Sequence, residues 1–215
     1  MNKIVEFFTM DYAELSHHQA HDLYRLRHET FKSRLNWRVN SHNGLEYDEY
    51  DTENTVYLFG MTAGEIICSA RFINTQHRNM TREIFSDFFG GITLPDDGSY
   101  IEVTRLFIDK NKRNTLGLSA YPLSKMIFIS MINYCIANDF KGMYAVVSQT
   151  MYLIFQRSGW KIILLQEGVS EKKEKIYFIY MPADRASVND MVSKGKKDPV
   201  LTSASLDHWP LAFLC

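Results

Sequence analysis

Three polar side chains stand in the middle of an apolar stretch, YIEVTRLFID, at residues 100–109. The stretch predicts a buried strand, in which Glu102, Thr104 and Arg105 are costly unless they are paired or take part in catalysis. Successive strand residues face opposite sides of a sheet, so Glu102 and Arg105 share a side only if an extra residue bulges the strand between them. Because bulges are common beside active sites, this conflict indicates a functional site.

Two arginines elsewhere also occupy positions where apolar packing is expected. In LYRLRHETF, Arg27 is four residues from both Leu23 and Phe31 and lies on the same helical stripe. In CSARF, Arg71 stands in a strand rich in Ile, Ala and Phe. An inward arginine requires an acidic partner. A purely structural ion pair between Glu102 and Arg71 is the alternative to a functional Glu102, because ion-pair networks also perturb pKa values without catalysis.

Acidic residues are concentrated in GLEYDEYD, at residues 44–51. We interpret Glu46 and Glu49 as members of a solvated loop, whereas Asp48 and Asp51 are candidates for pairing with the inward arginines. A metal site at Asp48 and Asp51 is an alternative, although the stretch lacks the ligand spacing of a calcium loop and nearby paired histidines.

Alternating strands and helices must position these residues. The spacing of apolar residues predicts one amphipathic helix at 11–34 with Asp11 as its N-cap, and the polar segment at 184–199 predicts a surface loop. The other expected elements are a hairpin at 56–73, strands at 100–109, 142–148, 160–168 and 174–182, and helices at 119–138 and 149–159. This order predicts an α/β fold, a three-layer α/β/α sandwich around a central sheet.

Composition excludes several classes of function. With 215 residues, 46% of them hydrophobic, we expect a single domain covering residues 1–215. The balance of 24 Lys and Arg against 25 Asp and Glu gives no overall attraction to nucleic acid. No apolar run approaches the ~18–20 residues of a membrane span, and the N-terminus lacks the pattern of a signal peptide. Together with three scattered cysteines, this predicts a cytoplasmic protein.

Six motifs resemble one family, the LuxI-type acyl-homoserine lactone synthases. They occur in order from LYRLRHETF through RLNW, EYDEYD, CSARF and EVTRLFID to RSGW, and the resemblance extends from about residue 4 to HWPL near the end. It implies a GNAT-like fold, in which the central sheet is mixed and splayed. It also implies a reaction between S-adenosylmethionine and an acyl chain carried as a thioester on acyl carrier protein, without a metal or a bound cofactor.

The resemblance also implies roles for individual residues. The implied catalytic residues are Glu102, Arg105 and Arg71. The implied binding residues for S-adenosylmethionine are Arg27, Phe31, Trp37, Asp48 and Asp51. The implied acyl pocket contains Thr104, Met131 and Ala145. Members of the family that prefer 3-oxo chains often carry Thr where this chain has Ala145, so strong 3-oxo selectivity is not expected.

Elementary chemistry fits these implied roles. An α-amine has a pKa of about 8, so a base such as Glu102 is needed to free it for attack near neutral pH. The sulfonium group would be favoured beside the aromatic rings of Trp37 or Phe31. The arginines either hold the substrate carboxylate or fix the acidic residues. We expect a buried network in which Arg27, Arg71 and Arg105 pair with Asp48, Asp51 and Glu102 and hold the N-terminal segment over the sheet.

The acyl donor is predicted from a loop and from surface charge. The loop at 110–123 precedes a helix and could receive an anion, but Asn114 and Ser119 depart from the R/Q-x-x-G-x-G/A pattern of a pyrophosphate loop. That departure favours acyl carrier protein over coenzyme A. Because carrier proteins are acidic, a basic docking surface is expected, with candidates Lys141, Arg157, Lys161, Lys172, Lys173 and Lys175. A GNAT-like N-acyltransferase using acyl-coenzyme A and another amine, and a non-catalytic acyl or nucleotide-binding module, are the two alternatives.

Overall fold

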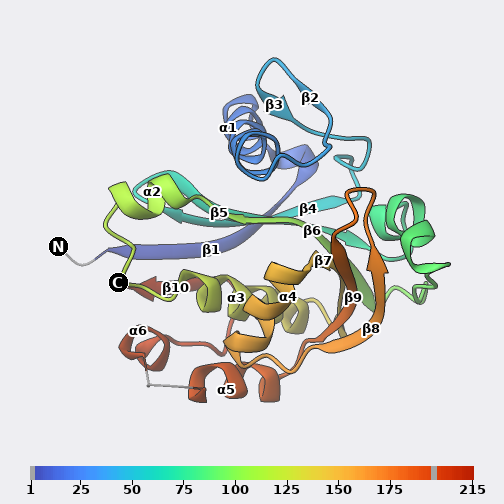
Figure 1. The fold of residues 1–215 in the computed structure, drawn as a ribbon. Helices are drawn as coiled ribbons and strands as arrows, with labels where there is room; N and C mark the ends of the chain where they lie inside the picture. Colours follow the sequence, from blue (N-terminus) through green and yellow to red (C-terminus); the bar gives the residue numbers. More distant parts are fainter. Residues whose placement is uncertain (1–2, 195–197) are drawn as a thin grey trace.

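A mixed eight-stranded sheet forms the centre of the protein in the computed structural model, which describes residues 3–194 and 198–215. The strand order is β10-β1-β4-β5-β6-β7-β9-β8, and Figure 1 shows the sheet between two layers of other elements. The bounds are β1 (Ile4–Asp11), β4 (Thr55–Thr62), β5 (Glu65–Asn74), β6 (Tyr100–Ile108), β7 (Gly142–Ser148), β8 (Ile163–Val169), β9 (Lys175–Pro182) and β10 (Leu211–Leu214). The predicted three-layer sandwich is confirmed.

The sheet splays between β6 and β7. These two strands are parallel and pair only at Tyr100 with Gly142, Ile101 with Met143 and Glu102 with Tyr144, although both continue well beyond these pairs. The other neighbouring strands of this sheet are antiparallel. The separation therefore begins immediately after Glu102, in the middle of the sheet.

Helices cover both faces of the sheet. One face carries α1 (His17–Arg27) and the small hairpin of β2 (Ser41–His42) and β3 (Leu45–Glu46), whereas α3 (Leu123–Ala137), α4 (Gln149–Ser158), α5 (Arg185–Ser193) and α6 (Pro199–Ser203) lie on the other (Figure 1). A short helix, α2 (Lys110–Thr115), follows β6. Within the described residues, none of these helices has both the length and the apolar character needed to cross a bilayer.

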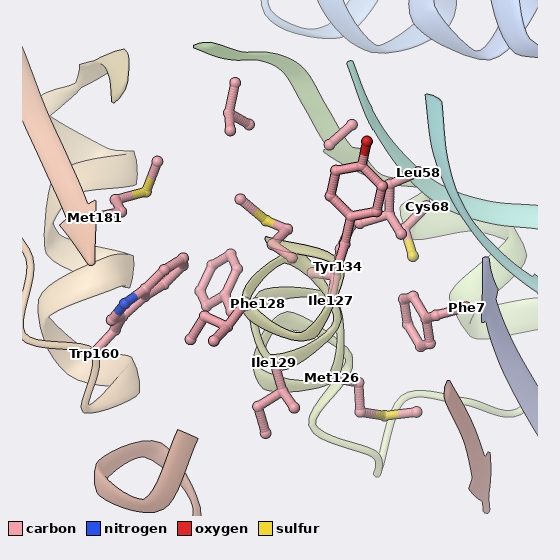
Figure 2. Close-up of a cluster of buried hydrophobic side chains, with 14 of the residues drawn as sticks. Phe7, Leu58, Cys68, Met126, Ile127, Phe128, Ile129, Tyr134, Trp160 and Met181 are labelled. Atoms are coloured by element: carbon pink, nitrogen blue, oxygen red, sulfur yellow. The ribbon is translucent and has the colours of Figure 1, made fainter. Parts of the chain in front are cut away.

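The main hydrophobic core surrounds α3, most of which is buried. Figure 2 shows Phe7 and Cys68 on one side of this helix and Trp160 and Met181 on the other. Phe7 and Cys68 come from β1 and β5, in one half of the splayed sheet, and Met181 comes from β9 in the other half. A helix that is apolar on all sides is stable only in the interior, so α3 joins the two halves of the sheet.

The single helix predicted at 11–34 is wrong. The chain forms a 3₁₀ turn at Tyr12–Glu14, then α1, and then a π-helical turn at His28–Arg34. The N-cap of α1 is Ser16, whose hydroxyl accepts a hydrogen bond from the N–H of Gln19 at 3.2 Å. A π-helical turn rotates the side chains that follow it, so continuous helical spacing could not describe the whole segment.

Four further segments differ from expectation. The polar segment at 184–199 contains α5, whose Val188 and Met191 are buried one helical turn apart, and the beginning of α6, while its residues 195–197 lie outside the described residues. The strands β1 and β10 were not expected, and α2 occupies part of an expected loop. The high average polarity of this segment did not indicate α5, because a single apolar stripe is enough to pack a surface helix against the core.

Candidate active site

The predicted bulge in β6 is present. Ser69 of β5 pairs with Phe107 and Arg71 pairs with Thr104, so a single β5 residue stands opposite Arg105 and Leu106. Arg105 has a φ of 53°, which is uncommon for a side chain with a Cβ. The extra residue brings Arg105 to the same face as Glu102 and Thr104, and Phe107 rather than Leu106 continues that face.

Arg27, at the end of α1, pairs with two carboxylates. Its Nε lies 2.6 Å from Oε2 of Glu46 in β3, and Nη1 and Nη2 lie 2.7 and 3.0 Å from the two oxygens of Asp51. All three side chains are buried. Bidentate pairing of this kind suits the planar guanidinium, and it fixes α1 to the segment that follows β3.

Arg71 and Arg105 complete a closed ring of charges. Arg71 lies 3.2 Å from Oδ2 of Asp48 through Nη2 and 3.1 Å from Oδ1 of Asp51 through Nη1. Nη2 of Arg105 lies 2.9 Å from Oε1 of Glu46 and 2.7 Å from Oδ2 of Asp48. Each carboxylate therefore bridges two arginines, in the order Arg27, Glu46, Arg105, Asp48, Arg71, Asp51. We call these six residues the charge ring; three positive and three negative charges make it neutral.

The charge ring departs from the expected network in two respects. Glu46, predicted in a solvated loop, is fully buried and bridges Arg27 and Arg105, so that prediction is wrong. Glu102 forms no ion pair with any described residue, so neither its predicted place in the network nor the alternative ion pair with Arg71 is present. Asp48 and Asp51 pair with arginines as expected.

The ring shifts the pKa values of its members unequally. Burial alone would raise the pKa of Asp51, but the guanidinium groups of Arg27 and Arg71 lower it well below its usual range. Burial would lower the pKa of Arg27 and Arg71, but their carboxylate partners raise both values. For Arg105, burial prevails over Glu46 and Asp48, and its pKa is lowered. Arg105 is therefore the ring arginine whose carboxylate partners offset its burial least.

Glu102 is a fully buried carboxyl beside this neutral ring. Its oxygens accept backbone hydrogen bonds from Met80, at 3.3 Å, and from Thr81. Burial raises the pKa of Glu102, while the side chain of Thr81, Arg71 and the two amides act in the opposite direction without cancelling the effect. A carboxyl whose pKa is raised towards neutrality is better matched to accepting a proton from an amine than an ordinary glutamate.

An aromatic pair borders the ring. The rings of Phe31 and Trp37 stack with centroids 5.2 Å apart and an angle of 22° between their planes. Phe31 is buried in the π-helical turn, and the Cζ of Arg105 lies 5.7 Å from its ring centroid. Trp37 is 38% exposed, so part of this side chain is accessible to a ligand cation. The structure thus brings Arg27, Phe31, Trp37, Asp48 and Asp51 close to Arg71 and Arg105.

The three residues of the expected acyl pocket do not share one surface. Met131 and Ala145 are buried in the core around α3. Thr104 lies on the opposite face of the sheet, where its hydroxyl accepts a hydrogen bond from Nε of Arg71 at 3.0 Å. The prediction that Thr104 lines a pocket with Met131 and Ala145 is therefore not supported by its position.

A cavity of about 270 Å³ lies at the beginning of α3, beside the end of α4. Its lining includes the cations Arg113, Lys125 and Arg157. Nε of Arg113 is buried without a hydrogen-bond partner among the described residues, and Pro122, at the N-cap of α3, offers no side-chain acceptor to the first turn. Unsatisfied donors and a helix N-terminus favour an anion in this cavity.

The candidate docking lysines do not form one surface. Lys141 and Lys175 lie near opposite ends of the antiparallel pair β7 and β9. Lys172 and Lys173 lie in the turn between β8 and β9, and Lys172 donates to the carbonyl of Asn36. Of the six candidates, only Arg157 lines the cavity at α3.

Sequence reasoning missed three contributors to this site. Glu46 and Asp48 alternate in GLEYDEYD, and this period of two could have placed both on one face of an extended segment. The amides of Met80 and Thr81 reach Glu102 from the beginning of the π-helical turn at Thr81–Phe85, more than twenty residues away along the chain. Backbone donors of this kind leave no signal in side-chain chemistry.

Comparisons with known proteins agree with the family resemblance. Residues 11–191 match the family model described as autoinducer synthase. The chain is 40% identical over 210 residues to an acyl-homoserine-lactone synthase of Pectobacterium parmentieri, covering 98% of this chain and 96% of that protein. It is 45% identical over 192 residues to an acyl-homoserine-lactone synthase of Serratia liquefaciens, covering 89% and 96% respectively.

A solved structure shows the same fold. The protein is similar to BjaI, a coenzyme A-dependent acyl-homoserine lactone synthase solved with S-adenosylmethionine and isopentyl-coenzyme A, with a TM-score of 0.75 and 18% identity over 88% of this chain and 89% of that one. The predicted GNAT-like fold is thereby confirmed. The chain belongs to the autoinducer synthase family, the acyltransferases known as acyl-homoserine-lactone synthases.

Proposed function

We propose that the protein transfers an acyl chain from acyl carrier protein to the amine of S-adenosylmethionine and then closes a homoserine lactone, releasing methylthioadenosine. The observation that carries this proposal is Glu102, a buried carboxyl without an ion-pair partner in the described structure, beside a neutral charge ring. S-adenosylmethionine brings an ammonium, a sulfonium and a carboxylate, so it carries one net positive charge. Ionised Glu102 supplies the single negative charge that balances it.

The first step is acyl transfer. Glu102 accepts a proton from the ammonium group, directly or through water, and the free amine attacks the thioester carbonyl. The C–N bond forms, the C–S bond breaks, and the pantetheine sulfur leaves and is protonated. Removal of the amine proton by a positioned base contributes roughly 10²–10⁴-fold to the rate.

The second step is lactone closure. A carboxylate oxygen of the substrate attacks the carbon bound to the sulfonium, so that a C–O bond forms and a C–S bond breaks. The sulfonium cation leaves as a neutral thioether, and the carboxylate charge is consumed in the ester. Before this step, the exposed face of Trp37 stabilises the sulfonium by a cation–π contact.

The cavity at the beginning of α3 is where we place the phosphate of the pantetheine arm. Arg113, Lys125, Arg157 and the N-terminus of α3 supply positive charge there. That phosphate is common to acyl carrier protein and coenzyme A, and BjaI is described as coenzyme A-dependent. We favour the carrier protein because Asn114 and Ser119 depart from a pyrophosphate loop. We also place the reaction in the cytoplasm, which the unpaired cysteines support.

The donor assignment is tested with two thioesters of one acyl chain, on carrier protein and on coenzyme A. Release of methylthioadenosine from S-adenosylmethionine should be faster, at equal donor concentration, with the carrier protein, and mass spectrometry should detect the lactone. Faster reaction with coenzyme A overturns the donor assignment alone. An amide product that forms from another amine, without methylthioadenosine, supports the N-acyltransferase alternative.

A further inference from the structure

Met80 contributes an unusual acceptor to the charge ring. Its Sδ lies 3.0 Å from Nη2 of Arg71 and 3.3 Å from Nη1 of Arg105. A thioether sulfur is a weak hydrogen-bond acceptor, whereas the other partners of these two guanidinium groups are carboxylates and a hydroxyl. Nη1 of Arg105 has no other hydrogen-bond acceptor in residues 3–194 and 198–215. Two cationic donors therefore converge on a point that a stronger acceptor would satisfy better.

This point is also where the ring is most open. The side chain of Arg105 is 8% exposed, whereas the side chains of the other five ring members are 5% exposed or less. Met80, which contacts Arg105, is 8% exposed. The ring of Phe31 lies over Arg105, and Trp37 stacks on Phe31. The lowered pKa of Arg105 shows that its present partners do not offset its burial. An additional anion at Nη1 would be stabilised there.

We propose that Nη1 of Arg105 and Nη2 of Arg71 form a carboxylate-binding subsite, and that Met80 fills this subsite until the carboxylate of S-adenosylmethionine displaces its thioether. The inference rests on the proposed function for the identity of the ligand. A carboxylate at this position forms charge-assisted hydrogen bonds, about twice as strong as neutral ones. Methionine is suited to displacement because its side chain is unbranched and has three rotatable bonds.

The position of the subsite fits the chemistry of the substrate. The backbone N–H of Met80 donates to Oε2 of Glu102 at 3.3 Å, so the same residue contacts the candidate base and fills the subsite. In S-adenosylmethionine the amine and the carboxylate are attached to one carbon. A carboxylate that replaces the sulfur of Met80 therefore places the amine in the neighbourhood of Glu102, where its proton must be removed.

A purely structural role for Met80 makes a different prediction. Met80 packs in a small hydrophobic cluster with Tyr50 and Ile73, and loss of this packing would affect all ligands through general destabilisation. If a carboxylate displaces Met80, substitution of Met80 should change the affinity only for ligands that contain a carboxylate. S-adenosylmethionine has the amino-acid moiety and methylthioadenosine lacks it, so the two form a matched pair of probes.

The test measures the dissociation constants of both probes by calorimetry for the full chain and for Met80→Ala and Met80→Leu. Both variants remove the sulfur acceptor, so S-adenosylmethionine should bind roughly two- to tenfold more tightly, the equivalent of one net hydrogen bond, with methylthioadenosine unchanged. Met80→Leu keeps most of the side-chain volume, so this variant alone is sufficient for the test if the alanine variant does not fold. Ile73→Val, in the same cluster, is the control and should leave both constants unchanged.

The result that overturns the inference is an equal change for both probes, or no change for either, in a wild-type protein that forms lactone. A wild-type protein that releases no methylthioadenosine from S-adenosylmethionine contradicts the proposed function instead. The two failures are therefore distinguishable in the same set of measurements.

Discussion

At the scale of single residues, the contrast between Glu102 and the charge ring is the basis of the proposed chemistry. The ring carboxylates each face two guanidinium groups. For Asp51, those of Arg27 and Arg71 outweigh the effect of burial and lower its pKa. Burial raises the pKa of Glu102, and the two backbone amides that donate to it do not cancel this effect. The pKa values of Asp51 and Glu102 are thus shifted in opposite directions, and the raised pKa of Glu102 suits the proton transfer that we propose.

Replacing Glu102 by glutamine should lower turnover by roughly 10²–10⁴-fold, because the variant cannot accept the amine proton. In the wild type, the rate should fall as pH falls through a pKa above that of an ordinary glutamate, since Glu102 must be ionised to act. Steady-state rates of methylthioadenosine release against pH measure both effects. The variant should lose this acidic limb and retain the wild-type melting temperature.

Exposed Glu53 supplies the matched control, since Glu53→Gln changes an acid on the surface by the same substitution. It should leave the rate and its pH dependence unchanged. Wild-type turnover in the Glu102→Gln variant would remove Glu102 from the mechanism.

At the scale of elements, the charge ring fixes α1 and the β2–β3 hairpin onto the sheet. Its members come from α1, from β3 and the turn after it, and from the neighbouring strands β5 and β6. Asp51 also accepts a hydrogen bond from the hydroxyl of Tyr57 in β4, at 2.7 Å. The aromatic pair and the base are thereby held close to one another.

Glu46→Gln should therefore destabilise the protein by about 3–5 kcal/mol, because it leaves Arg27 and Arg105 partly unpaired in the interior. Urea unfolding followed by circular dichroism gives the free energy. Glu49→Gln, the same change three residues away on an exposed side chain, should alter it by less than about 0.5 kcal/mol. Equal effects of the two substitutions would contradict a structural role for the ring.

The sequence predicted some of these elements and not others, for physical reasons. The bulge in β6 was predictable because the two-residue period of a strand conflicted with the positions of Glu102 and Arg105. The contact between Glu46 and Arg105 was not, because the two residues are 59 positions apart and the local alternation of Glu46 with Asp48 shows only a shared face. The prediction of one helix at 11–34 was wrong because apolar spacing does not show where an α-helix changes to a π-helical turn.

At the scale of the whole molecule, α3 holds together a sheet that splays along its middle. Its buried side chains contact residues of both halves (Figure 2). The pairing of β6 with β7 ends beside Glu102, where the core around α3 packs on one face of the sheet and the charge ring lies on the opposite face. If the chain is a single domain, as the sequence predicts, the two halves of the sheet should unfold cooperatively.

Because α3 is shared, we expect the two halves to unfold together. A Trp37→Phe, Trp209→Phe variant leaves only Trp160, which is buried beside α3 and α4. Its fluorescence and the far-ultraviolet circular dichroism should give the same urea midpoint. Separate midpoints for the two signals would show that the halves are independent units.

The burial of the charge ring has a consequence for the ionic conditions in which the enzyme works. Dissolved ions screen charges that face water over about 8–10 Å at physiological strength, but they screen a buried circuit of charges much less. The proposed binding site for S-adenosylmethionine, beside the charge ring, should therefore keep its geometry at low and at high salt concentration. Sensitivity to salinity should arise at the cavity beside α3, where we place the donor's phosphate and where Arg157 is exposed, and it should appear as weaker binding of the donor.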